Sequence, residues 1–240
     1  IGRKTDYGLI DDFSDAGADR ELAWLRDAVA EMKSRFDYAQ LSPEAQTSYD
    51  IWLYNLKQAE AGLPFRSHRY VLHQHNGLQS FFPTFLINTH KVATEADMQG
   101  FIQRLSGVAT ALDQLLVRAK SNADAGTRPP RFAYEGVIDQ STKIISGAPF
   151  DDGAPSAIWT ATEEKLRGLV DSGAIDEARA AELRDAAKTA LISAFAPAYQ
   201  RIIAWYQSDM PNTDASPKGV GALANGQAFY NYRLANQTTT

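Results

Sequence analysis

Apolar residues recur every three or four positions along most of the chain, which is the spacing of one face of an α-helix. We expect a first helix capped by Asp15 or Asp19, with an apolar stripe made of Leu22, Leu25, Val29, Met32 and Phe36. Ser42-Pro43-Glu44 predicts a second helix start, because serine caps free N–H groups and proline needs no N–H at the first helical position. This helix should end at Gly62-Leu63-Pro64.

The most regular stripe lies in the middle of the chain and consists of Phe101, Leu105, Val108, Leu112 and Leu115. Thr94-Glu95-Ala96-Asp97 precedes it and resembles a capping box with aspartate in place of glutamate. The pattern therefore predicts a helix that starts near Thr94 and extends to about Lys120.

Three helical stretches are predicted further along. One lies near residues 131–146, and one carries Leu166 and Leu169. The last follows Asp176 as its cap and continues to about Tyr206. Because an interior proline removes one backbone hydrogen bond, Pro197 predicts either a kink or two helices that meet there.

Residues 65–90 break the helical pattern. Tyr70-Val71-Leu72 has strand character, Asn76-Gly77 signals a turn, and Pro83 interrupts the chain again. We expect a short strand or extended segment there, followed by irregular chain or a short helix. The fold class is therefore predicted to be mainly α, with long antiparallel helices and at most one or two short strands.

The composition excludes several classes of protein and of functional site. The 240 residues are 44% hydrophobic and 22% charged, with a net charge of −5 and no cysteine. No cluster of basic residues indicates a nucleic-acid surface, and no apolar run approaches the roughly 18 residues that would span a membrane. The absence of cysteine excludes disulfides, thiolate metal sites and a cysteine nucleophile within the chain, and is compatible with a bacterial periplasm.

Candidate chemistry in the residues themselves is sparse. His73 and His75 would share one side of a strand and could hold a metal, but no third ligand follows at a suitable offset, which favours hydrogen-bonded or surface histidines. No H-E-x-x-H, G-x-S-x-G or phosphate-binding glycine motif occurs. Acidic pairs such as Asp151-Asp152 are most simply loop charges. We therefore assign no catalytic residue and no metal ligand within the chain.

Residues 221–240, GALANGQAFYNYRLANQTTT, combine a turn-rich entry with a short aromatic helix, in which Tyr230 and Leu234 share one face. The glycine of Asn225-Gly226 allows close approach of the backbone to another group, so that a pocket wall is one interpretation of Tyr230 and core packing another. The closing threonines are typical of the N-cap of a further helix. We expect this chain to be the front part of a longer protein, and to expose apolar surface when taken alone.

The order of five stretches resembles the N-terminal half of a bacterial family called domain of unknown function 885, from about Asp11 to Thr240. They are LSPEAQTSYDIWLYNL, HQHNGLQSFFPTFLINTH, FIQRLSGVATALDQLLVRAKSNADAGTRPP, FAPAYQRIIAWY and GALANGQAFYNYRLANQTTT. Members of that family are described as lipoproteins or secreted proteins. The resemblance therefore implies a periplasmic or secreted location, with or without a lipid anchor.

The resemblance also implies a larger helical fold of the zinc metallopeptidase type, similar to carboxypeptidases. Its H-E-x-x-H motif and a downstream glutamate ligand would follow Thr240, so zinc is expected in the full-length protein and no cofactor in this chain. Residues 1–240 would then be the N-terminal helical portion of a single larger domain, truncated before that motif. The expected partners are the C-terminal remainder of the same protein and a peptide substrate, with no nucleic acid and no membrane-spanning segment.

The resemblance implies that Gly77, Gln79 and the stretch from Asn225-Gly226 to Tyr230 match recurring family positions that would suit the wall of a channel. The residues implied to contact substrate are Gln79, Asn225, Gly226 and Tyr230. Tight turns with a buried tyrosine are the alternative interpretation of these positions. For the chain as a whole, the expected function is a non-catalytic part of a peptidase. The alternative is a helical binding or interaction module with no catalysis.

Overall fold

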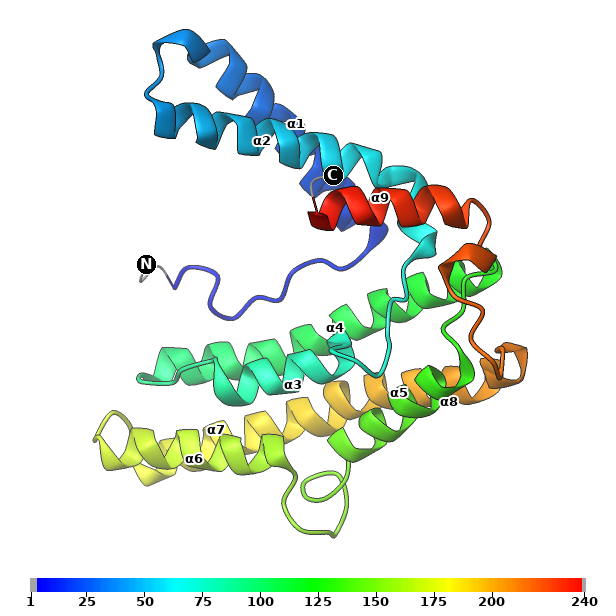
Figure 1. Ribbon diagram of the computed structural model, residues 1–240. Helices are drawn as coiled ribbons and strands as arrows, with labels where there is room; N and C mark the ends of the chain where they lie inside the picture. Colours follow the sequence, from blue (N-terminus) through cyan, green and yellow to red (C-terminus); the bar gives the residue numbers. More distant parts are fainter. Residues whose placement is uncertain (1–3, 239–240) are drawn as a thin grey trace. The chain divides into compact units, whose positions relative to one another are not determined.

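The computed structural model describes residues 4–238, which are helical apart from loops and turns (Figure 1). Within that range no β-strand forms, and the nearest approach to one is an isolated bridge between Ala148 and Pro155. The contacts divide the chain into two compact units. The first unit comprises the chain up to Asp12 with residues 70–120 and 128–216, and the second comprises residues 13–69, 121–127 and the chain from Pro217. The prediction of one larger domain stays a prediction.

The first unit is a bundle in which α5 packs on α8, α6 on α7, and α3 on both α5 and α6 (Figure 1). The predicted central stripe is confirmed as core, because all five of its side chains are at most 1% exposed. The helices are α3 (Leu78–Asn88), most of α4 (Glu95–Asp124), α5 (Arg131–Ile144), α6 (Ala157–Asp171), α7 (Glu177–Ala190) and α8 (Ala196–Asp209).

The second unit contains α1 (Asp15–Arg35), α2 (Pro43–Ala61) and α9 (Gly226–Thr238). α1 packs against α2, and α9 reaches α2 through two hydroxyl groups. Tyr54 of α2 donates to the Ala235 carbonyl at 3.3 Å, and Tyr232 of α9 donates to the Gln58 carbonyl at 3.4 Å. None of the residues of α2 is fully buried, so this helix keeps part of its apolar surface in contact with solvent.

Most of the predicted helix starts are confirmed by their caps. The Ser42 hydroxyl accepts the Ala45 N–H at 3.3 Å, and Asp176 accepts the Arg179 N–H at 2.7 Å. The cap of α1 is an exception, because Ser14 accepts the Gly17 N–H at 3.0 Å. The prediction of Asp15 or Asp19 was therefore wrong by at least one residue, since the extended backbone needed at a cap occurs at Ser14.

The two interior prolines have different consequences. α3 continues through Pro83, where an interruption was expected. At Pro197 the chain widens into a π-helical turn, Leu191–Phe195, before α8 begins, so the predicted meeting of two helices is confirmed. The wider turn keeps the proline ring away from the carbonyl groups of the turn before it.

Tyr70-Val71-Leu72 forms bends and no strand. Leu72 is nevertheless fully buried, and its carbonyl oxygen accepts the Tyr206 hydroxyl at 3.3 Å. The expected strand or extended segment is therefore wrong for Val71 and Leu72, since the chain bends there and a strand needs a neighbouring strand with which to share its hydrogen bonds.

The expected apolar exposure is concentrated in large side chains at the surface. In the α1–α2 hairpin they are Trp24, Phe36, Ile51 and Trp52. Thr238 is the last residue of α9, and its hydroxyl donates to the Leu234 carbonyl at 2.8 Å. The remaining threonines of the closing run lie outside the described residues. Across residues 4–238, every helix is too short or too polar to cross a membrane.

Candidate functional site

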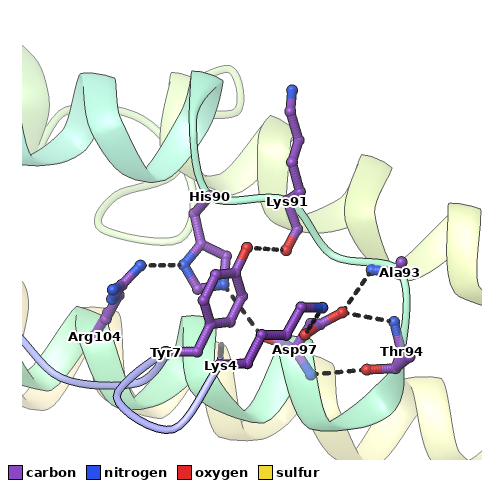
Figure 2. A network of polar contacts seen from close by, with 8 residues as sticks. All are labelled: Lys4, Tyr7, His90, Lys91, Ala93, Thr94, Asp97 and Arg104. Atoms are coloured by element: carbon purple, nitrogen blue, oxygen red, sulfur yellow. Dashed lines mark hydrogen bonds and ion pairs between the residues drawn. The ribbon is translucent and has the colours of Figure 1, made fainter. Parts of the chain in front are cut away.

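A network of polar side chains surrounds His90, in the loop between α3 and α4 (Figure 2). Its base is the predicted capping box, in which the Thr94 hydroxyl accepts the Asp97 N–H at 3.2 Å and Asp97 accepts the Thr94 N–H at 3.1 Å. The same Asp97 oxygen also accepts the Ala93 N–H at 3.1 Å. The first turn of α4 is therefore tied to the loop that carries His90.

His90 is 1% exposed, and both of its ring nitrogens have partners. Nδ1 lies 2.9 Å from Arg104 Nη1, and Nε2 lies 3.2 Å from the Asp97 carbonyl oxygen. Arginine only donates, so Nδ1 accepts from Arg104 and Nε2 carries the hydrogen that is donated to Asp97. This arrangement specifies the neutral imidazole.

Aromatic rings enclose His90. The Tyr7 ring lies over the imidazole with centroids 4.3 Å apart (Figure 2). The Phe101 ring meets the imidazole edge-on, with centroids 5.5 Å apart. Arg104 lies between the Tyr7 and Phe85 rings, 5.2 and 5.1 Å from their centroids. These contacts exclude water from the imidazole and hold it in one orientation.

The charges around His90 favour its neutral form. Burial lowers the pKa of His90, the charges of Arg104 and Lys165 act in the same direction, and the bond to the Asp97 carbonyl opposes them. Burial alone would raise the pKa of the Asp97 carboxyl, but bonds from Lys4, Ala93 and Thr94 lower it below its usual value. Asp97 is therefore an anion that is already paired with Lys4, at 2.5 Å.

The network around His90 can hold parts of the chain in place, but it offers no general base. A general base needs a free lone pair that can reach a substrate proton, and both nitrogens of His90 are engaged inside the fold. What the network does hold is the segment before α1, through Lys4 and Tyr7.

Gln79, predicted to contact substrate, lies in α3 and is completely buried. Its amide nitrogen donates to the His73 carbonyl at 2.7 Å and to Gln140 Oε1 at 2.9 Å, while its own side-chain oxygen has no partner within the structure. Gln140 in turn lines a cleft of about 330 Å³ between α3, α5 and the start of α6, together with Ser80, Pro83 and Lys143. Gln79 therefore positions Gln140 at that cleft.

The other three predicted residues lie in the second unit, so they and Gln79 belong to different units. Asn225 adopts a left-handed backbone, with φ of 55°, immediately before α9. Gly226 is buried, and a Cβ added to it would lie 2.1 Å from the Val220 carbonyl oxygen, so the predicted close backbone approach is confirmed. Tyr230 is 53% exposed, which makes the interpretation of a buried tyrosine wrong. Substrate contact by all four residues stays a prediction.

A groove of about 510 Å³ on the second unit lies between α1 and α2. Two oppositely charged residues, Glu31 and Arg35, belong to its lining and form an ion pair at 2.7 Å. Trp52 extends the apolar surface toward Trp24, with ring centroids 6.0 Å apart. The apolar lining consists of Ala28, Met32, Phe36, Leu41, Ala45, Tyr49 and Trp52.

The described residues do not fit a zinc site. His90 is fully engaged, His68 Nε2 is 2.6 Å from the Ala224 carbonyl oxygen, and His73 Nδ1 accepts the His75 N–H at 3.2 Å. In residues 4–238 no three histidine, aspartate or glutamate side chains gather closely enough to bind a metal ion. Within the described part of the chain, the pair of His73 and His75 therefore has no third ligand beside it.

Neither the His90 network nor the α1–α2 groove was predicted from the sequence. The capping box next to His90 was visible, but Lys4 and Tyr7 are 93 and 84 positions from their partners. The apolar stripe of α1 was recognised as a helix face, yet a face that packs and a face that stays open have the same periodicity.

Comparison with known proteins places the chain in a fold and a family. A family model described as "Bacterial protein of unknown function (DUF885)" matches residues 1–240. The structure is similar to a crystal structure from Colwellia psychrerythraea whose name is "putative lipoprotein", with a TM-score of 0.81 and 15% identity. That likeness covers 98% of this chain and 40% of the other, so the chain spans less than half the length of the protein it resembles. No curated protein matches the chain.

Proposed function

This chain belongs to the bacterial family of unknown function DUF885, and on that premise we propose that it is the N-terminal helical part of a larger, secreted zinc metallopeptidase-like protein. Its role would be to form one wall of the substrate cleft and to bind peptide without catalysing its hydrolysis. The apolar groove between α1 and α2 is the observation that carries this proposal.

The groove has suitable size and chemistry for a peptide side chain. Its volume of about 510 Å³ is within the range of small-molecule sites. Tyr49 and Trp52 offer rigid apolar area, and such residues dominate binding energy at interfaces because little side-chain entropy is lost when they make contact. Glu31 and Arg35 supply polar groups that can meet the backbone of an extended peptide.

The chemistry itself is assigned to the remainder of the protein. A catalytic zinc would polarise the scissile carbonyl group and activate water when bound. Because the described residues provide no ligand set for the ion, the part assigned to this chain is to bind and orient peptide. The proposed location is the periplasm or the cell exterior, with or without a lipid anchor, and the name of the Colwellia psychrerythraea protein supports it.

A second candidate function is a helical interaction module without catalysis. The exposed apolar side chains of the α1–α2 hairpin favour it, because partner-binding surfaces share that property. The two functions differ in what the complete protein does to a peptide.

The test uses the complete protein, purified and incubated with a library of quenched fluorescent peptides. Chelator-sensitive hydrolysis that returns on addition of zinc is the expected result. Peptide binding without any cleavage across the library would support the interaction module and overturn the peptidase proposal. Absence of both binding and cleavage would overturn both candidate functions.

A further inference from the structure

The segment of residues 4–10 is held in place by side-chain contacts. It contains turns but no helix or strand. Lys4 pairs with Asp97 at 2.5 Å, and the Tyr7 hydroxyl donates to the Lys91 carbonyl at 2.6 Å (Figure 2). Arg104 Nε donates to the Leu9 carbonyl at 2.9 Å. We call this segment the N-terminal strap.

All three attachments of the strap converge on His90. The Tyr7 ring lies tilted against the imidazole, Asp97 accepts the Nε2 hydrogen through its carbonyl, and Arg104 donates to Nδ1 (Figure 2). Arg104 connects the two sides, since its Nη1 bonds His90 while its Nε bonds the strap. A change in protonation at Nδ1 that moves the Arg104 guanidinium therefore also disturbs its bond to the Leu9 carbonyl.

A second proton on His90 conflicts with this geometry. The proton would enter Nδ1, the position that now accepts from Arg104, so two N–H donors and two positive charges would face each other at 2.9 Å. Water cannot relieve the conflict, because the ring is 1% exposed. Either Arg104 or the imidazole must move when the proton binds.

Among the described residues, the charge of Asp97 favours an imidazolium at His90, but this carboxylate is already paired with Lys4. Tyr7 faces His90 from the strap, with the ammonium of Lys4 5.1 Å from the centroid of the Tyr7 ring, and Asp97 and Arg104 face His90 from α4. Lys165 of α6 donates to the His90 carbonyl at 3.0 Å. Asp97 is paired with Lys4, and Asp11 acts on Arg104.

We propose that the N-terminal strap is an acid-sensitive latch, which lies on α4 while His90 is neutral and is released when His90 gains a proton. Protonation displaces Arg104, and with it the bond to Leu9 and the contact with the Tyr7 ring. Two attachments remain, which are the Tyr7 hydroxyl bond to the Lys91 carbonyl and the ion pair of Lys4 with Asp97. The Asp97 side chain is 3% exposed, but the Lys4 side chain is 52% exposed, so water competes for its ammonium group and weakens its hold on the strap. This inference is independent of the proposed function.

Hydrogen–deuterium exchange of the complete protein at pH 7.5 and pH 5.0 tests the proposal, with rates corrected for the pH dependence of chemical exchange. We expect protection of amides in residues 4–10 to fall at least tenfold at pH 5.0, while protection in residues 105–116 of α4 stays the same. Asp97 remains ionised in this range because its pKa is lowered, so its titration does not contribute. Equal protection of the strap at both pH values would overturn the proposal.

His90→Gln is the decisive variant, because a carboxamide can accept from Arg104 and donate to the Asp97 carbonyl but does not titrate. The strap of this variant should stay protected at pH 5.0. His68→Gln, the same change in the second unit, should keep the wild-type loss of protection. If His90→Gln does not fold, Arg104→Gln is the second test variant. Because it removes the guanidinium, the difference in strap protection between pH 7.5 and pH 5.0 should become at least threefold smaller. An undiminished pH response in the folded variant would refute the latch.

Discussion

Tyr199 of α8 donates its hydroxyl hydrogen to the carbonyl oxygen of Gln79 in α3, at 2.6 Å. In a regular α-helix that oxygen would accept from the residue four positions later, which is Pro83 and has no N–H. A buried tyrosine from another helix therefore satisfies the acceptor that the proline leaves free, and this explains why α3 continues through Pro83.

Tyr199→Phe should lower the free energy of unfolding by about 1–3 kcal/mol, because it leaves a buried carbonyl group without a partner. In a Pro83→Ala background the loss should be clearly smaller, since the new backbone N–H at position 83 can bond to the Gln79 oxygen. Urea denaturation of the wild type, both single variants and the double variant measures this coupling. Identical losses in the two backgrounds would show that the Tyr199 hydroxyl and Pro83 act independently.

Trp52→Ala should raise the KM of the complete protein for peptide by about 5–30-fold, which corresponds to roughly 1–2 kcal/mol of lost contact in the α1–α2 groove. Fluorescent peptide hydrolysis measures it, or fluorescence anisotropy if the protein binds without cleavage. Phe132→Ala is the matched control, because Phe132 is also an exposed aromatic residue, 49% exposed, but lies outside the groove. Similar effects of the two substitutions would contradict a binding role for the groove.

Tyr230→Ala should weaken peptide binding more than it weakens folding. The side chain is 53% exposed, so its removal should change the free energy of unfolding by no more than about 0.5 kcal/mol. Chemical denaturation and peptide titration of the same variant measure the two quantities. A loss of stability without loss of binding would assign Tyr230 to packing of α9 alone.

Stability should fall in mild acid because of His90. Its pKa in the folded protein is lowered by burial and by Arg104 and Lys165, whereas in the unfolded chain it is about 6.5. The unfolded state therefore binds a proton first, and the stability contributed by neutral His90 is complete above about pH 6.5 and is lost as the pH falls toward the lowered value. Urea midpoints at pH 7.5 and 5.0 measure this loss, and His90→Gln should reduce it. An equally steep decline in that variant would attribute the effect to other groups.

Local features were predictable from sequence because their causes lie within a few residues. The capping box at Thr94 and Asp97, the helix start at Ser42 and the meeting of two helices near Pro197 all depend on one helical turn of backbone. The apolar periodicity of α4 likewise identified a buried face. The exception at Ser14 shows the limit, since several adjacent polar residues can serve as caps and only the backbone conformation selects one.

The candidate site was predicted only in fragments. The sequence and the family resemblance pointed to Gln79, but its partner Gln140 is 61 positions away and belongs to another helix. The exposure of Tyr230 could not be inferred either, because a helical stripe shows which residues share a face and leaves open whether anything covers it.

The sequence by itself determined that this protein is helical, where most of its helices begin, and to which family it belongs. Only the tertiary structure decided that Lys4 and Tyr7 meet His90, Asp97 and Arg104, and that a neutral imidazole is enclosed there. The physical reason is that caps and periodicity act over one or two turns of a helix. The protonation state of a buried group depends instead on every charge and ring that folding brings to it from distant parts of the chain.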